Sequence, residues 1–265
     1  MGSWPEYPEI DREHVEKAFT KYAEGYDLSD VKNKLKYDHT FRVAAMCDAI
    51  SESLPLEKPR KDLAWLTGML HDIGRFEQVR RYHTFRDGDS VNHAQLSADI
   101  LFHDDLIRRF VSNPSKDALV EKTIRLHNVY ILPDSLTEEE YLFATILRDA
   151  DKIDIMRVNV ETPMEEIYDL PTEAFRNAPI SDFVLEDILG ERNVDRRKSK
   201  TAVDYLIGHI AFIYGIVYPE SIRQIDRQGY LSRMLEFESD LPDTNRKFKQ
   251  IKEAVAGYVN KRLGR

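Results

Sequence analysis

Hydrophobic residues recur at helical spacing along most of the chain. Between Leu28 and Ile50, apolar positions such as Val31, Leu35, Val43 and Met46 fall three or four residues apart on either side of His39, which is the period of one helix face. Asp30 and Ser115 stand where two helix N-caps are expected, and Gly74 where a helix is expected to end. The same reasoning predicts further helices over residues 61–73, 92–102, 116–127 and 138–156.

Strand patterns are weak throughout, and the Asp87-Gly88 pair lies in a polar loop rather than between two alternating runs. Residues 161–200 have weak periodicity, three prolines and a mixed-charge run, so we expect a loop-rich insertion there. Helical periodicity returns over 201–265 and ends in an amphipathic segment from about 244 to 263. We therefore predict an all-α fold, a helical bundle with additional C-terminal helices, as one domain over 1–265 rather than two.

Composition is ordinary for a globular protein, with 265 residues of which 42% are hydrophobic and 32% charged. The formal net charge of −9 removes the broad basic surface that usually accompanies binding to a nucleic-acid duplex. A small anionic ligand held by a local group of basic residues remains compatible with this charge.

Cys47 is the single cysteine, so the chain can form neither an intrachain disulfide nor a thiolate zinc cluster. The first residues, MGSWPEYPEIDREH, are acidic and lack the apolar run of a secretory signal. The longest apolar stretch, residues 210–218, is too short to span a bilayer. These features predict a cytoplasmic protein without a membrane partner.

Four of the eight histidines fall on apolar helix faces or at their ends, namely His39, His71, His93 and His127. One inward-facing histidine is most simply a hydrogen-bonded core residue. Four on different helices, with acids nearby, favour a metal site, because imidazole and carboxylate are common ligands of divalent ions. The acids concerned are Asp72 and Asp151, with Asp149 and Asp154 expected to be solvated or to hydrogen-bond the ligands; a second pair, His103-Asp104, is expected at the surface.

Three motifs in this order resemble the HD-domain superfamily of metal-dependent phosphohydrolases. They are His39 within HTFRVAAM, HDIGR at 71–75, and DADKID at 149–154, and the similar region runs from about 30 to 157. The resemblance implies an all-α core that carries a divalent metal. By this resemblance the primary ligands are His39, His71, Asp72 and Asp151, with Asp149 as the alternative to Asp151.

His93 and His127 resemble the additional histidines of dinuclear members, in which the acid that matches Asp72 bridges two ions. Two ions can together activate a water and stabilise a leaving oxygen. The alternative is one ion with two structural histidines. The metal is left open among Mn, Fe, Mg, Ni and Zn.

Basic residues gather around the motifs and predict contacts to a substrate phosphate. Arg75 and Lys152 adjoin ligands, and Arg42 lies one turn after His39. His83, in the following loop, is either a phosphate contact and general acid or simply an exposed histidine. Arg80, Arg81 and Arg86 are further phosphate candidates, for which the alternative is a solvated loop paired with Glu77, Asp87 and Asp89; the run at 196–200 is expected to be solvated.

We therefore expect a metal-dependent hydrolase of phosphate esters or anhydrides, acting on a nucleotide-like or other small phosphorylated substrate through a metal-activated water. Its catalytic residues would be Asp72, Arg75, Lys152 and His83. One alternative is a dinuclear iron oxygenase on the same HD scaffold, since the ligand set also suits iron. Another is a non-catalytic, ligand-sensing HD module. The sequence specifies neither the substrate nor the oligomeric state.

Overall fold

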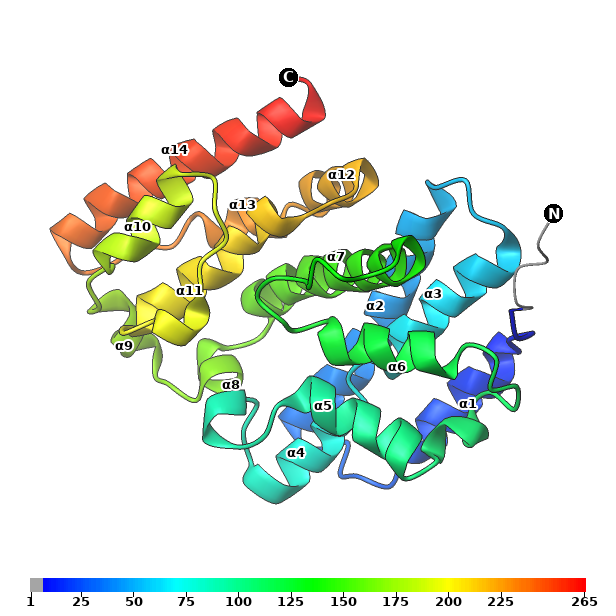
Figure 1. The fold of residues 1–265 in the computed structure, drawn as a ribbon. Coiled ribbons are helices and arrows are strands. Elements are labelled where there is room, and N and C mark those ends of the chain that lie inside the picture. The colour runs from blue at the N-terminus through cyan, green and yellow to red at the C-terminus, as the bar shows by residue number, and fades with distance from the viewer. Residues whose placement is uncertain (1–6) are drawn as a thin grey trace. The chain divides into compact units, whose positions relative to one another are not determined.

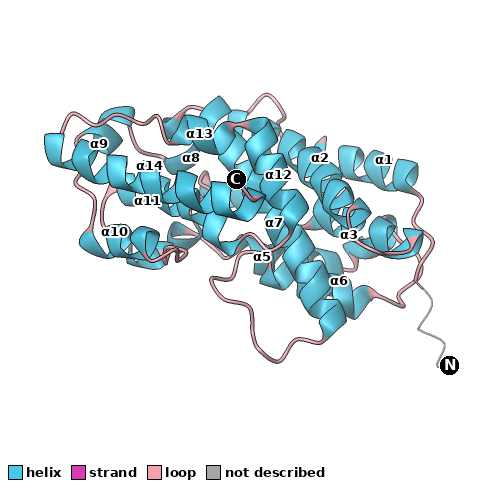
Figure 2. Ribbon diagram, turned by 90° about the horizontal axis from the view of Figure 1, so that it is seen from above, coloured by secondary structure: helices cyan, strands magenta, loops and turns pink. Residues whose placement is uncertain are grey.

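The computed structural model describes residues 7–265, and in this range the chain consists of helices joined by turns and loops, without a strand (Figure 2). The predicted all-α fold is confirmed. Residues 1–6, at the start of the segment judged to lack a secretory signal, lie outside the described range. Contacts divide the chain into two compact units that meet in sequence at residues 151 and 152. The expectation of a single domain stays a prediction.

The first unit contains the helices on which the motifs lie (Figure 1). Most of the predicted ranges match these helices to within a few residues. Asp30 caps α2 as predicted, because its carboxylate accepts the backbone N–H groups of Lys32 and Asn33. The helices are α1 (Arg12–Ala23), α2 (Val31–Glu52), α3 (Lys58–Leu70), α4 (Gly74–Tyr82), α5 (His93–Ala98) with a π-helical turn (Asp99–His103), α6 (Asp117–Leu126) and α7 (Glu138–Glu161), which continues into the second unit.

Ser115 does not cap α6, so that prediction is wrong. The helix begins after Lys116, whose side chain makes no capping hydrogen bond. Asn113 shapes the turn before the helix, because its side chain accepts the backbone N–H of Ser115 at 2.9 Å.

Helices α2 and α3 lie side by side at the centre of the first unit (Figure 1). Gly68 permits this approach, because a Cβ at this position would lie 2.7 Å from the Cα of Ala44. On α1, Arg12 donates to Asp48 on α2 at 2.8 Å and to Asp62 on α3 at 2.9 Å. These ion pairs hold α1, α2 and α3 together beside the turn that carries His71 and Asp72.

Gly74 begins α4 rather than ending α3, which corrects the expectation that it stops a helix. A Cβ on Gly74 would lie 2.6 Å from the backbone nitrogen of Ser97 on α5. Its own N–H donates to the Ser97 hydroxyl at 3.0 Å. The glycine therefore lets α5, the helix of His93, pack directly on the turn that carries His71 and Asp72.

The second unit, from residue 152 onward, is also helical, and its segment 161–200 holds more helix than predicted. Pro163 and Pro171 stand at the N-caps of α8 and α9, where proline begins a helix without losing a hydrogen bond. The helices are α8 (Met164–Tyr168), α9 (Thr172–Arg176), α10 (Asp182–Leu189), α11 (Ala202–Ile210), α12 (Pro219–Gln228), α13 (Tyr230–Met234) and α14 (Pro242–Leu263), with α14 against α10 and α12.

Candidate metal centre

The six predicted ligands come from five separate places in the first unit and meet in its interior. His39 lies in the middle of α2, and His71 and Asp72 occupy the turn between α3 and α4. His93 is the first residue of α5. All six side chains are buried or nearly so; the set is completed by His127 at the end of α6 and Asp151 on α7.

The first group contains His39, His71 and Asp151. His39 Nε2 lies 3.2 Å from Asp151 Oδ1, and His71 Nε2 lies 3.7 Å from the same oxygen. The two Nε2 atoms are 3.3 Å apart. Asp72 Oδ2 stands 3.6 Å from His39 Nε2 and 3.5 Å from His71 Nε2, so it faces the same point.

The second group contains His93 and His127 and lies beside Oδ1, the other oxygen of Asp72. His93 Nε2 and His127 Nε2 are 3.0 Å apart, and each lies 3.7 Å from Asp72 Oδ1. One carboxylate is therefore placed between two pairs of histidines, with one oxygen toward each pair.

The hydrogen bonds of the outer ring nitrogens, Nδ1, determine whether the inner nitrogens, Nε2, carry a proton or a lone pair. His71 Nδ1 lies 2.7 Å from the carbonyl of Gly68, and His127 Nδ1 lies 2.7 Å from that of Ile124. A carbonyl only accepts, so both Nδ1 atoms must carry the proton. The inner Nε2 atoms of these two rings then carry lone pairs, which is the form in which histidine binds a metal.

These inner atoms fit a bound cation. His127 Nε2 faces His93 Nε2 at 3.0 Å, and two lone pairs at this distance repel unless a positive charge lies between them. Asp72 Oδ1 is buried and accepts no hydrogen bond, which is costly for an ionised oxygen without a partner. Two sets have ligand atoms close enough to hold an ion, His39, His71 and Asp151 in one and His71, Asp72 and His127 in the other.

The electrostatics keep His93, His127 and Asp72 in their ligand forms. Burial, with the nearby His93 and His71, lowers the pKa of His127 to about 3, and burial together with Arg75 lowers the pKa of His93. Burial acts to raise the pKa of Asp72, but the charges of Lys36 and Arg75 outweigh it and hold that pKa well below its usual value. His93 and His127 are therefore neutral and Asp72 is ionised.

Asp151 is held in its ionised form as well. Against the effect of burial, His39 and His71 hold its pKa well below the usual value. Asp149 is also buried, as is Asp154, so of the two alternatives for these acids the solvated one is wrong, and a hydrogen bond to the ligands stays a prediction. The geometry brings Asp151, rather than the alternative Asp149, to the first group of histidines.

Two cations stand beside Asp72. Lys36 is buried and its Nζ lies 2.7 Å from Asp72 Oδ2. Arg75 Nε lies 3.7 Å from Asp72 Oδ1. Both also lie against the ring of Phe85, at 5.4 and 5.5 Å from its centroid. Sequence reasoning missed Lys36, although its position one turn before His39 places it on the same helix face.

Other predicted phosphate contacts lie elsewhere. Arg80 donates to Glu77 at 2.6 Å, and Arg81 also pairs with Glu77. Arg86 pairs with Asp89 at 3.0 Å. All three guanidinium groups are exposed, so the structure places them in surface ion pairs, as the alternative interpretation expected, and not among the ligands.

The remaining candidates have different surroundings. His83 is exposed and ends α4 with a φ of 57°. Arg42 is half-buried on α2. Lys152 is buried in the second unit, with its Nζ 3.3 Å from the carbonyl of Gly215. His103 is exposed, which confirms the surface placement of the second His-Asp pair.

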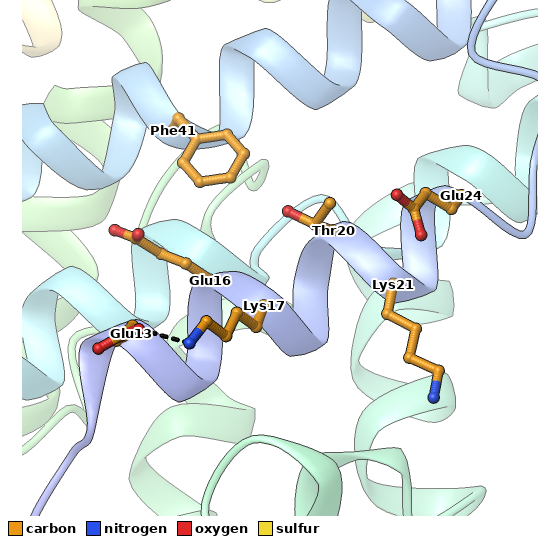
Figure 3. Close-up of a pocket in the computed structure, with 7 residues that line it drawn as sticks. All are labelled: Glu13, Glu16, Lys17, Thr20, Lys21, Glu24 and Phe41. Atoms are coloured by element: carbon orange, nitrogen blue, oxygen red, sulfur yellow. Dashed lines mark hydrogen bonds and ion pairs between the residues drawn. The ribbon is translucent and has the colours of Figure 1, made fainter.

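A hollow lies along the outer face of α1 beside Phe41 of α2 (Figure 3). Lys17 pairs with Glu13 at its edge, as drawn in Figure 3. None of the six predicted ligands lines it, so it is separate from the candidate centre; its lining is Glu13, Glu16, Lys17, Thr20, Lys21, Glu24 and Phe41.

One comparison with known proteins finds a family. The family model described as HD domain matches residues 37–156, just under half of the chain. No curated protein and no solved structure gives a significant match. None of the helices within residues 7–265 combines the length and the apolarity that a bilayer span requires. Residues 37–156 thus belong to the HD-domain superfamily, whose members are mostly metal-dependent phosphohydrolases.

Proposed function

We propose that this HD domain is a metal-dependent hydrolase of phosphate esters or anhydrides. The observation that carries the proposal is the placement of Asp72 between two histidine pairs, with Lys36 and Arg75 beside its oxygens. His39, His71 and Asp151 would hold one divalent ion, His93 and His127 a second, and Asp72 would contribute to both. Such ions lower the pKa of water and polarise a phosphoryl oxygen.

The protein's own groups have distinct parts in this proposal. His93 and His127 stay neutral and keep their lone pairs inward because burial opposes protonation. Lys36 and Arg75 are cations next to the ligands, and they would orient a phosphate and balance the charge that develops on it. Lys152 directly follows Asp151 in the chain, and we keep it as a further phosphate contact.

The two cations favour phosphate chemistry over the iron oxygenase alternative, which the ligand set alone does not exclude. We therefore expect a small substrate with one or more phosphate groups, such as a nucleotide. We leave out Arg80, Arg81 and Arg86, whose guanidinium groups are held in exposed ion pairs.

The test is phosphate release from a panel of phosphate monoesters, diesters and nucleoside polyphosphates by manganese-loaded protein. We expect Asp72→Ala to lower the rate on the best substrate by at least about 100-fold, because both groups of ligands lose their shared oxygen donor. His103→Ala, the exposed histidine of the second His-Asp pair, is the matched control and should retain full activity.

Full activity in Asp72→Ala would contradict the proposal. Oxygen uptake by iron-loaded protein, without phosphate release from any substrate, would favour the oxygenase. Tight nucleotide binding without turnover would favour a ligand-sensing module.

A further inference from the structure

The carboxylate of Asp87 is the centre of a hydrogen-bond network beside the second histidine pair. It lies in a short turn, Asp87–Asp89, within the loop between α4 and α5. One oxygen lies 2.6 Å from His93 Nδ1 and accepts from Asn128 Nδ2 at 3.2 Å. The other accepts from Gln78 Nε2 at 3.1 Å and from Arg75 at 3.2 Å.

His93 needs such a partner because its own helix offers none. His71 and His127 each donate Nδ1–H to the carbonyl three residues earlier, on the helix that they end. His93 is instead the first residue of α5, so the residue three positions earlier, Ser90, belongs to the loop. A side chain must therefore accept the Nδ1 proton of His93, as a helical carbonyl does for His71 and His127.

We infer that Asp87 is the positioning residue for His93. Because an ionised carboxylate only accepts, the proton of His93 lies on Nδ1, and Nε2 presents its lone pair toward His127 and Asp72. Through its other oxygen the same carboxylate holds Arg75, whose Nε faces Asp72. Asp87 thus links one proposed metal ligand with one proposed phosphate contact. This inference rests on the proposed two-ion site.

The loop has a second anchor that does not use Asp87. Gln78 Nε2 also donates to the hydroxyl of Ser90 at 2.8 Å and to the carbonyl of Val91 at 3.0 Å. Its amide therefore continues to hold the loop on α4 when the Asp87 carboxylate is removed. A positioning role for Asp87 can thus be separated from a purely structural one.

The experiment is manganese titration of metal-free protein by calorimetry, with electron paramagnetic resonance to distinguish paired from single Mn²⁺. We expect Asp87→Ala to weaken one of the two binding events by about 10–100-fold and to leave the other within about 2-fold, the range found when the partner of a ligating histidine is lost. Asp87→Asn keeps an oxygen acceptor and should lose less.

Two controls accompany these variants. Asp89→Ala removes an exposed acid of the same turn, which pairs with Arg86, and should bind both ions like the wild type. Since Asp87 acts through His93, the double variant Asp87→Ala/His93→Ala should bind no more weakly than His93→Ala.

Unchanged binding of both ions, or equal weakening of both, overturns the inference. If Asp87→Ala does not fold, Asp87→Asn decides by the same criterion, since it keeps the shape of the side chain. A wild-type protein that takes up one ion contradicts the two-ion site itself and this inference with it. Two ions in the wild type with no selective loss in the Asp87 variants contradict only the inference.

Discussion

At the scale of single residues, the direction of the imidazole protons determines what the site can bind. His71, His93 and His127 each give their outer proton to an acceptor, so three lone pairs converge around Asp72. The sequence indicates that these histidines face inward, because they lie on apolar helix faces. It does not indicate their tautomers, which depend on the carbonyl groups and the carboxylate that the fold brings beside each ring.

The low pKa of His127 makes stability depend on pH. In the unfolded chain histidine titrates near pH 6.5, whereas the folded protein holds His127 neutral down to about pH 3. Between these values the unfolded state binds more protons, so stability present above pH 6.5 is lost as the pH falls. Urea unfolding of metal-free protein should give a free energy lower by about 2 kcal/mol at pH 5 than at pH 7.5 from this residue alone.

His127→Asn supplies the comparison for this measurement. The variant lacks the titrating ring, so its loss of stability between the two pH values should be smaller by about the same amount. An unfolding free energy that is constant or rises toward pH 5 in the wild type would show that His127 is not held neutral.

Lys36 is the residue-scale feature that the sequence interpretation missed. Lys36→Met removes an ammonium 2.7 Å from Asp72 but retains an unbranched apolar side chain beside Phe85. We expect kcat/KM for a phosphate substrate to fall by about 10–100-fold, mainly through KM, since a charge-assisted contact to phosphate is lost. Steady-state kinetics measure this change.

Lys34→Met is the matched control for Lys36→Met. Lys34 is exposed on the same helix and pairs with Asp38, so its loss should leave both kinetic constants unchanged. Equal kinetics of the two variants would remove Lys36 from the site.

At the scale of elements, much of the first unit follows from periodicity, because apolar residues recur at helical spacing along its long helices. Two other features of the chain do not. Residues 161–200 form short helices, two of them with a proline at the N-cap, and windows of so few residues show little periodicity. Asp149 and Asp154 are buried although solvation is one of the two expectations for them, because the pattern of one helix does not show how many of its sides are covered.

The contact between α2 and α3 gives a prediction at this scale. Gly68→Ala places a Cβ 2.7 Å from the Cα of Ala44, and a backbone atom cannot rotate away. We expect a loss of about 1–3 kcal/mol in the free energy of unfolding, measured by urea titration. His71 shares this site through the Gly68 carbonyl, so metal affinity should fall as well.

Gly257→Ala tests whether the Gly68 effect comes from the contact or from the substitution itself. Gly257 lies within α14 and has no atom within 4 Å of the Cβ position. Alanine there should raise stability by roughly 0.5–1 kcal/mol through helix propensity. A Gly68→Ala protein as stable as the wild type would contradict the close packing of α2 on α3.

At the scale of the whole molecule, the functional prediction concerns only part of the chain. The HD match and all six proposed ligands lie within residues 37–156. The ordered motifs suffice to predict this region from sequence, because each ligand is tied to a local pattern. The second unit carries no such motif. Helix over 201–265 could be predicted from sequence, but the short helices of 161–200 and the unit's contribution to function could not.

The charge near the candidate site differs from the net charge of the whole molecule. The chain carries −9 overall, yet Lys36 and Arg75 stand next to Asp72. In the proposed function, a small anion would be recognised by local cations and bound ions, against the average charge of the protein.

The most direct test of the central claim is the number of metal ions that the protein holds. Metal-free wild-type protein would be reconstituted with manganese or iron in separate samples, desalted, and measured by elemental analysis. We predict about two ions per chain, and about one in a variant that lacks both His93 and His127. One ion or none in the reconstituted wild type would contradict the two-ion site on which the proposed hydrolysis depends.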